Sequence, residues 1–183
     1  MERIMSGTAA LTMCCVSYLI WWIMDFRPDG KSMTSWPWLM ATMLLAFIGV
    51  WLSIAGIGEA EKSSLRFGIW PVGIGIAVYL VLMAGSGAIL HRQVTAELLL
   101  IVGWTVLQIC VLDAAGAMTG ELTWTNLFMV FAMLVAAVSF LAYLAYYNLS
   151  PVAGYIDGMV PLLLCGGLML AEIVVMGCGW NVR

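Results

Sequence analysis

The sequence predicts an all-α integral membrane protein, a bundle of about six transmembrane helices joined by short loops. Of its 183 residues, 64% are hydrophobic and 9% are charged, and the mean hydropathy is +1.06. Soluble domains carry about 25% charged residues, so this chain has too few polar side chains for a water-exposed surface. Its apolar runs extend over roughly 18–25 residues and lack the alternation of barrel strands. We therefore expect helices, whose backbones satisfy their own hydrogen bonds in lipid.

The spans follow one another along a single transmembrane domain. The first ends at a polar segment beginning with Asp25, and it lacks the small-x-small cleavage site of a signal peptide. Pro37 suits the first turn of the second span. Polar or Pro-containing segments separate the spans, at residues 25–31, 59–66, 91–93, 113–123 and 150–151. The predicted spans are residues 7–24, 36–58, 67–90, 94–112, 124–148 and 152–176.

The distribution of basic residues predicts the orientation. Six spans place both termini on one side of the membrane. That side carries Arg3, Lys62, Arg66 and Arg183, against Arg27, Lys31 and Arg92 on the other. The positive-inside rule then favours cytoplasmic termini, in a bacterial or archaeal cell membrane. Five tryptophans near the predicted span ends are expected to be interfacial anchors: Trp36, Trp38, Trp70, Trp124 and Trp180.

Several function classes lack their characteristic residues. The net charge is −3 and the basic residues are scattered, so no nucleic-acid partner is predicted. The five cysteines form no CxxC pair, the signal expected of a disulfide oxidoreductase. The single histidine, His91, provides neither bis-histidine haem ligation nor a histidine metal cluster. Without an HExxH, GxSxG or Gly-rich phosphate motif, we predict no enzymatic activity, no cofactor and no metal site.

Asp157 is the first candidate for a functional residue. Ionisable groups inside the hydrocarbon cost about 2.5–3.5 kcal/mol on insertion scales, so they indicate a site. Asp157 lies about two turns into the last span, and Pro161, one turn further on, frees a backbone carbonyl. Asp157 either lines a polar solute path or acts as a proton-sensitive gate. The alternative is an interfacial acid in a helix first turn, favoured by the helix dipole.

Glu172 and Gln108 are the other two path-lining candidates. Glu172 lies within the last two turns of the sixth span, so it either lines a path or extends to the interface. Gln108 lies in the middle of the fourth span, where it either hydrogen-bonds a neighbouring helix or lines a cavity.

Two glycine pairs have the GxxxG spacing of helix association motifs, Gly116/Gly120 and Gly154/Gly158. Small residues at this spacing let two helix backbones approach closely. The first pair lies partly in a predicted loop, whereas the second lies within a span. Each pair serves either a dimer or ordinary packing within the chain.

The chain resembles the acetate/succinate permeases and the related acid-gated urea and amide channels. The resemblance rests on residues 48–64, where an apolar helix runs through Ala55-Gly56 into a loop with Glu59, Glu61 and Lys62, and on Phe67-Gly68 at the next helix. The late acid Glu172 and the turn at residues 27–32 also fit. This resemblance implies a homo-oligomer, with a hexameric ring as the expected form and a narrow solute path in each protomer. The permeases' Asn-Pro-Ala-Pro-Leu-Gly-Leu signature is missing, so no substrate-binding residue is carried over.

Two functions are compatible with the sequence. The first is a homo-oligomeric channel or transporter for a small polar solute, such as a short carboxylate, urea or an amide. An apolar, aromatic constriction would select the solute by size. The alternative is a non-catalytic membrane subunit that scaffolds a larger complex. Short loops and scattered glycines suit both, and the partners expected in either case include membrane lipid.

Overall fold

The computed structural model describes residues 1–26, 35–65, 68–90, 96–146 and 148–180. Regular structure in these ranges is entirely helical: α1 (Glu2–Asp25), α2 (Trp36–Glu59), α3 (Ile69–Leu90), α4 (Ala96–Thr119), α5 (Leu122–Tyr146), α6 (Pro151–Asp157) and α7 (Val160–Trp180). Six described stretches are long and apolar enough to cross a membrane, the last formed by α6 and α7 together. The predicted fold class is confirmed. The protein is an α-helical integral membrane protein with six candidate spans.

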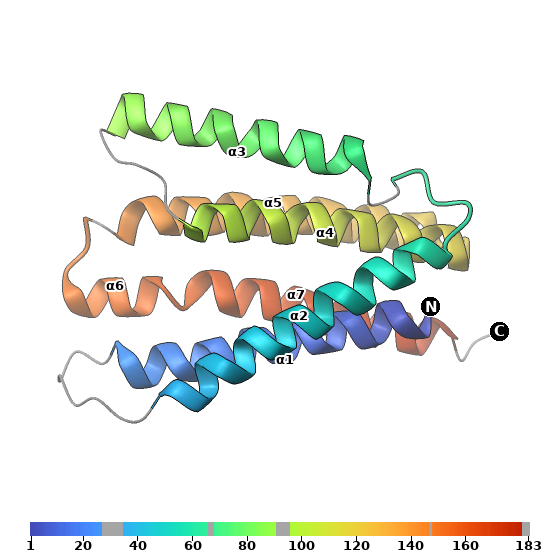
Figure 1. Ribbon diagram of the computed structural model, residues 1–183, viewed down its shortest axis with the longest axis horizontal. Helices are drawn as coiled ribbons and strands as arrows, with labels where there is room; N and C mark the ends of the chain where they lie inside the picture. The colour runs from blue at the N-terminus through green and yellow to red at the C-terminus, as the bar shows by residue number, and fades with distance from the viewer. Residues whose placement is uncertain (27–34, 66–67, 91–95, 147, 181–183) are drawn as a thin grey trace.

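The helices form an elongated bundle in which consecutive spans run in opposite directions (Figure 1). The start of α1 and the end of α7 lie at one end of the bundle, where α2 also ends. We call this the terminal end, and the opposite end, which holds the end of α1 and the short helix α6, the far end. Helix α1 packs against α2 and α7, and α5 packs against α4 and α7. An apolar core in the terminal half joins residues of α1, α2, α4 and α7, among them Ile4, Ile57, Val111 and Met169.

Small residues bring α1 and α2 into close contact. A Cβ added at Gly56 would lie 2.9 Å from the backbone nitrogen of Ile4, and one at Gly7 would lie 2.8 Å from the backbone nitrogen of Ser53. Gly49 packs in the same way against Leu11. Positions 49, 53 and 56 have helical spacing, so they form one stripe of small residues on α2. At the terminal end, Arg3 forms an ion pair with Glu59 at 3.1 Å.

Helix α4 continues beyond Leu112, the predicted end of the fourth span, to Thr119. Asp113, placed in a loop from the sequence, is therefore helical. Its carboxylate accepts hydrogen bonds from the Ser63 and Ser64 hydroxyls at 2.6 and 2.8 Å and from the Leu65 backbone N–H at 2.8 Å. These bonds satisfy the Asp113 carboxylate within α4 and fix the segment at Ser63–Leu65 to this helix. Gly120 ends α4 with a φ of 75°, a left-handed conformation that favours glycine.

Three of the four GxxxG glycines pack against side chains of the same chain. Gly116 lies against Thr125 at the α4–α5 turn, and Gly120 forms that turn. Gly154 contacts the Tyr146 ring, and Gly158 lies under the Trp22 ring. These contacts give intramolecular packing at Gly116, Gly154 and Gly158, whereas a Cβ added at Gly120 would meet nothing within 4 Å.

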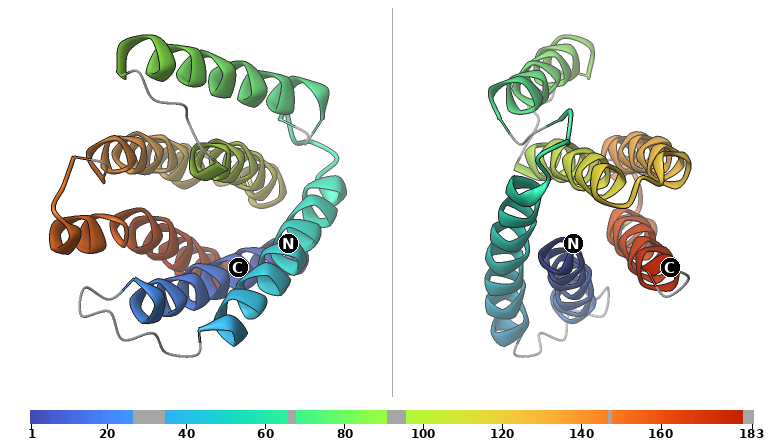
Figure 2. Two further views of the ribbon diagram at one scale, coloured as in Figure 1. Left: turned by 60° about the vertical axis from the view of Figure 1, so that its left-hand side comes forward. Right: turned by 90° about the vertical axis from the view of Figure 1, so that its right-hand side faces the viewer.

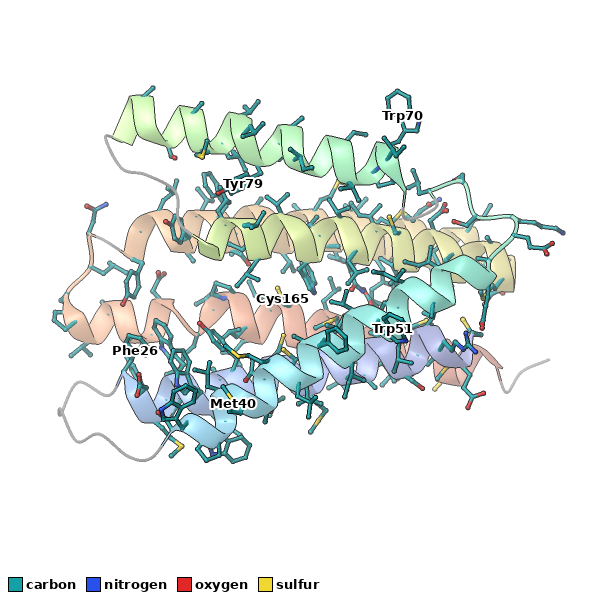
Figure 3. The ribbon with its side chains drawn as sticks, in the orientation of Figure 1. Phe26, Met40, Trp51, Trp70, Tyr79 and Cys165 are labelled. Atoms are coloured by element: carbon teal, nitrogen blue, oxygen red, sulfur yellow. The ribbon has the colours of Figure 1, made fainter. Side chains whose placement is uncertain are left out.

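Helix α3 stands apart from the other helices and packs mainly against α4 (Figure 2). Ile69 and Trp70 at its start are 89% and 82% exposed. The side chain of Trp70 points away from the bundle, whereas Tyr79 points towards the layer of α4 and α5 (Figure 3). Most of the surface of α3 therefore faces lipid or another protein chain.

Four of the five predicted anchor tryptophans have described side chains, and the Trp180 side chain lies outside the described part of the structure. Trp36, Trp38, Trp70 and Trp124 are exposed within the first three residues of their helices. The polar turn at residues 27–32, the His91–Gln93 boundary, Arg66 and Arg183 lie outside the described residues. The cytoplasmic orientation of the termini therefore stays a prediction.

Candidate functional site

Gln108 and Glu172 meet in the interior of the bundle. The Gln108 side chain donates a hydrogen bond from Nε2 to Oε2 of Glu172. One turn earlier on both helices, Trp104 Nε1 donates to the sulfur of Met169 at 3.5 Å. The helices α4 and α7 therefore run in the same direction here, joined by long side chains. Gln108 thus bonds to a neighbouring helix, one of the two roles its position predicted.

The carboxyl of Glu172 is almost completely buried. Glu172 and Gln108 are each 1% exposed, so the predicted alternative in which Glu172 extends to the interface is wrong. The reason is that α7 turns this side chain towards α4, where Gln108 offers an amide. The neighbouring core includes Leu107, Val111 and Met169, so the hydrogen bond lies in apolar surroundings, where it is stronger than in water.

Gln108 lies near the middle of its candidate span, whereas Glu172 lies towards the end of its own, six residues before Cys178. Gln108 is near the midpoint of the Leu98–Thr119 stretch. At about 1.5 Å per residue, it is about 15 Å from either end, which is half of the roughly 30 Å hydrocarbon core. The Glu172 carboxyl that bonds to Gln108 also lies within an apolar span, where an ionised group is costly.

One oxygen of Glu172 has no partner. Its Oε1 atom is buried and makes no hydrogen bond to any described residue. Among those same residues, the ion pairs are those of Glu59 with Arg3 and with the amino terminus, at the terminal end. An ionised carboxylate offers about four acceptor positions, of which Gln108 fills one. The site therefore has capacity for a further hydrogen-bonding or proton-carrying group.

Other buried polar atoms without a partner are less costly. In the described part of the chain these include the hydroxyls of Ser53 and Ser139. Ser53 lies against Gly7, and Ser139 lies beside Cys165, a residue inside the bundle (Figure 3). Both hydroxyls are neutral, whereas a carboxyl has a charged form that burial penalises far more strongly. Glu172 is thus the distinctive polar group of the interior.

Asp157 lies elsewhere, at the end of α6 and the far end of the bundle. About 15 residues of helical rise separate it from Glu172, or roughly 22 Å. Its side chain is partly exposed, and its Oδ2 atom is buried without a partner among the described residues. The helix is interrupted between Asp157 and Val160, where Pro161 lacks the N–H that would bond the Asp157 carbonyl. The structure does not bring Asp157 together with Gln108 and Glu172.

Aromatic residues close the far end around this interruption. Trp22 Nε1 donates to the Tyr155 carbonyl at 3.1 Å, and the Tyr155 hydroxyl donates to the Ile23 carbonyl at 3.4 Å. The ring of Phe26 stacks on Trp22 with a centroid distance of 4.2 Å. The sequence analysis did not predict this contact. Trp22 near the end of the first span, and Gly158 and Pro161 in the last span, are nevertheless visible in the sequence. Together the aromatic contacts fix α1 to the first half of the last span.

The site carries no metal-binding cluster in the part of the chain described, where no three His, Cys, Asp or Glu residues come together. Its chemistry is that of one amide and one carboxyl in an apolar surrounding. Such a pair binds protons or hydrogen-bonding solutes.

Comparisons with known proteins found no match to any family model, curated protein or solved structure.

Proposed function

We propose that this protein transports a small polar solute through the membrane, as a channel or coupled transporter, and that Gln108 and Glu172 line the path. The observation that carries this proposal is the buried carboxyl of Glu172 with one bonded and one free oxygen. Ionisable groups within membrane spans mark solute or ion paths by default. A purely structural link between α4 and α7 would need only a neutral side chain at position 172.

The surroundings of the pair suit selection by size. Trp104, Met169 and Leu107 provide apolar and aromatic surface next to the polar atoms. A narrow apolar constriction with few polar contacts favours small solutes over large or strongly hydrated ones. Short carboxylates, urea and simple amides are the solutes we propose. Asp157 is assigned a lesser role, at the far-end entrance to the path.

The resemblance to the acetate/succinate permeases and to the urea and amide channels supports the same class of function. It includes Glu172, the acid that forms the polar pair, and it implies a ring of identical subunits. The terminal end carries exposed Arg3 and Lys62, which favours a cytoplasmic location for the termini.

A scaffold subunit of a larger complex is the second candidate. The observation that favours it is the isolation of α3, whose start is exposed at Ile69 and Trp70. Another protein could cover this helix. The two candidates differ in assembly: a transporter should purify as one defined homo-oligomer, whereas a scaffold should purify with other chains. Native mass spectrometry in membrane discs distinguishes them.

Flux measurements in proteoliposomes test the transport proposal. Acetate and urea uptake are measured for the wild type, for Glu172→Gln and for Glu59→Gln. Glu59 is a matched control because it is an exposed glutamate whose ion pair contributes about 0–1 kcal/mol. We expect uptake above that of empty liposomes for the wild type and Glu59→Gln, and at least an about tenfold loss for Glu172→Gln, equivalent to about 1.4 kcal/mol. Equal uptake by wild-type and empty liposomes for both solutes would contradict the proposal.

A further inference from the structure

We infer that the ligand of the free Glu172 oxygen is a proton, and that Glu172 takes up and releases this proton as the transport path opens to water. The inference rests on the proposed function for its role in transport. The proton site itself rests on the burial and bonding of Glu172.

The hydrogen bonds of the pair define where the proton binds. Gln108 donates to Oε2, which is therefore an acceptor. The free Oε1 atom is the position left for a proton. With that proton bound, the side chain is neutral and the bond from Gln108 is kept. Without it, a full charge is buried with one hydrogen bond, a state that apolar surroundings strongly disfavour.

A metal cation fits this position poorly. Hard cations such as Ca²⁺ take six to eight oxygen ligands. The described core beside Glu172 supplies apolar and sulfur-containing side chains, such as Val111 and Met169. A proton needs only one oxygen, which Glu172 has.

The other charged groups described on the surrounding helices lie near helix ends or are already bonded. Charged groups lie towards the helix ends, and those described on elements near α7 are Glu2, Arg3, Asp25, Glu59, Asp113, Glu121 and Asp157. Of these, Asp113 is nearest along α4, and its oxygens accept from Ser63, Ser64 and Leu65. The remaining titratable groups are thiols and phenols: Cys14, Cys15, Tyr18, Cys110, Tyr143, Tyr146, Tyr155, Cys165 and Cys178. No ion pair links any of them to Glu172 in the described structure.

The step is a simple proton transfer. Water or a proton-carrying solute reaching the site gives a proton to Oε1, an O–H bond forms there, and the donor is left with one proton fewer. Release reverses this step when water or solute can solvate the carboxylate. No other bond changes, and no electron is transferred.

Infrared difference spectroscopy of the protein in membrane discs tests the proton site without any solute. We expect a carbonyl band of a protonated, buried carboxyl whose intensity falls as the pH is raised. This band should be absent in Glu172→Gln and present in Glu59→Gln. A wild-type band that persists at every pH, or that survives in Glu172→Gln, would overturn the inference.

A second variant serves if Glu172→Gln does not fold. In Glu172→Asp the titrating carbonyl band should be retained at a shifted frequency. A band of unchanged frequency would assign it to another group. Proton movement is followed with a pH dye inside the flux vesicles. Solute flux without a titrating band refutes the proton site alone, whereas a titrating band without flux of acetate or urea refutes the proposed function alone.

Discussion

The terminal half and the far end of the bundle each hold one buried carboxyl oxygen without a partner, yet their surroundings differ. In the terminal half, Glu172 lies in a continuous helix, is 1% exposed and bonds to Gln108. At the far end, Asp157 ends a seven-residue helix, is partly exposed and lies beside aromatic residues. The same carboxyl chemistry therefore stands in two different settings: a buried polar pair between α4 and α7, and a partly exposed acid at the end of α6.

The two regions also differ in what their closely packed glycines contact. In the terminal half, α1 and α2 approach so closely that Gly56 meets the backbone of Ile4. At the far end, Gly158 meets the ring of Trp22, which is a side chain. A backbone cannot shift without moving its helix, whereas a side chain can shift locally, although the Trp22 ring is held by its hydrogen bond to Tyr155 and by stacking on Phe26. The terminal half is thus packed backbone against backbone, and the far end is packed through side chains.

Substituting Gln108 should produce the largest change in stability. Gln108→Met removes the donor and leaves the buried Glu172 carboxyl without any partner among the described residues. Such unsatisfied groups cost about 1–3 kcal/mol, and more when charged. We expect a lower midpoint of thermal unfolding in membrane discs. Thr105→Ala is the control, since the Thr105 hydroxyl donates to a carbonyl of its own helix, that of Ile101. An equal loss of stability in both variants would mean that the bond between Gln108 and Glu172 does not stabilise the fold.

Tight packing in the terminal half predicts the next largest effect. Gly56→Ala places a methyl group 2.9 Å from the Ile4 backbone nitrogen and 2.6 Å from its side chain, and overpacking typically costs about 1–3 kcal/mol. Gly58→Ala, in the same helix, meets nothing within 4 Å. Thermal unfolding should show a loss for Gly56→Ala and little change for Gly58→Ala. Similar midpoints for the two variants would show that α1 and α2 are not in close contact.

A smaller effect is expected at the far end. Gly158→Ala would bring a methyl group against the Trp22 ring, which can shift at a cost of about 0.5–1.5 kcal/mol for an off-rotamer side chain. Gly167→Ala in α7 has open space and is the control. Tryptophan fluorescence should change in Gly158→Ala alone, with a modest drop in stability. A loss as large as that of Gly56→Ala would contradict the distinction between the two regions.

Asp157 should give the smallest effect on transport. Because it is partly exposed and lies near a span end, solvent screens its charge. Asp157→Asn should lower acetate or urea uptake by no more than about threefold. The expected loss in Glu172→Gln is about tenfold or more. Uptake assays in the same liposome preparation measure both. A larger loss in Asp157→Asn would place the decisive acid at the far end.

The sequence predicted the number of spans because a long apolar run crosses lipid as a helix, which satisfies its own backbone hydrogen bonds. It also selected Gln108 and Glu172, since isolated polar residues in such runs are conspicuous. Their pairing could not be predicted, because helices that are apolar all round do not reveal which faces meet. The extension of α4 past Asp113 was missed for a similar reason: the carboxylate is satisfied by Ser63 and Ser64, distant in sequence. The α1–α2 contact was also missed, although Gly49, Ser53 and Gly56 carry its spacing.

The most direct test is to remove both members of the polar pair together. Replacing two hydrogen-bonded partners by apolar groups of similar shape is nearly neutral for stability, so Gln108→Met with Glu172→Met should fold with a thermal midpoint close to that of the wild type. The proposed function predicts that this stable double variant takes up neither acetate nor urea beyond the rate of empty liposomes. Uptake at the wild-type rate by the double variant would contradict it and would make the pair a structural link between α4 and α7.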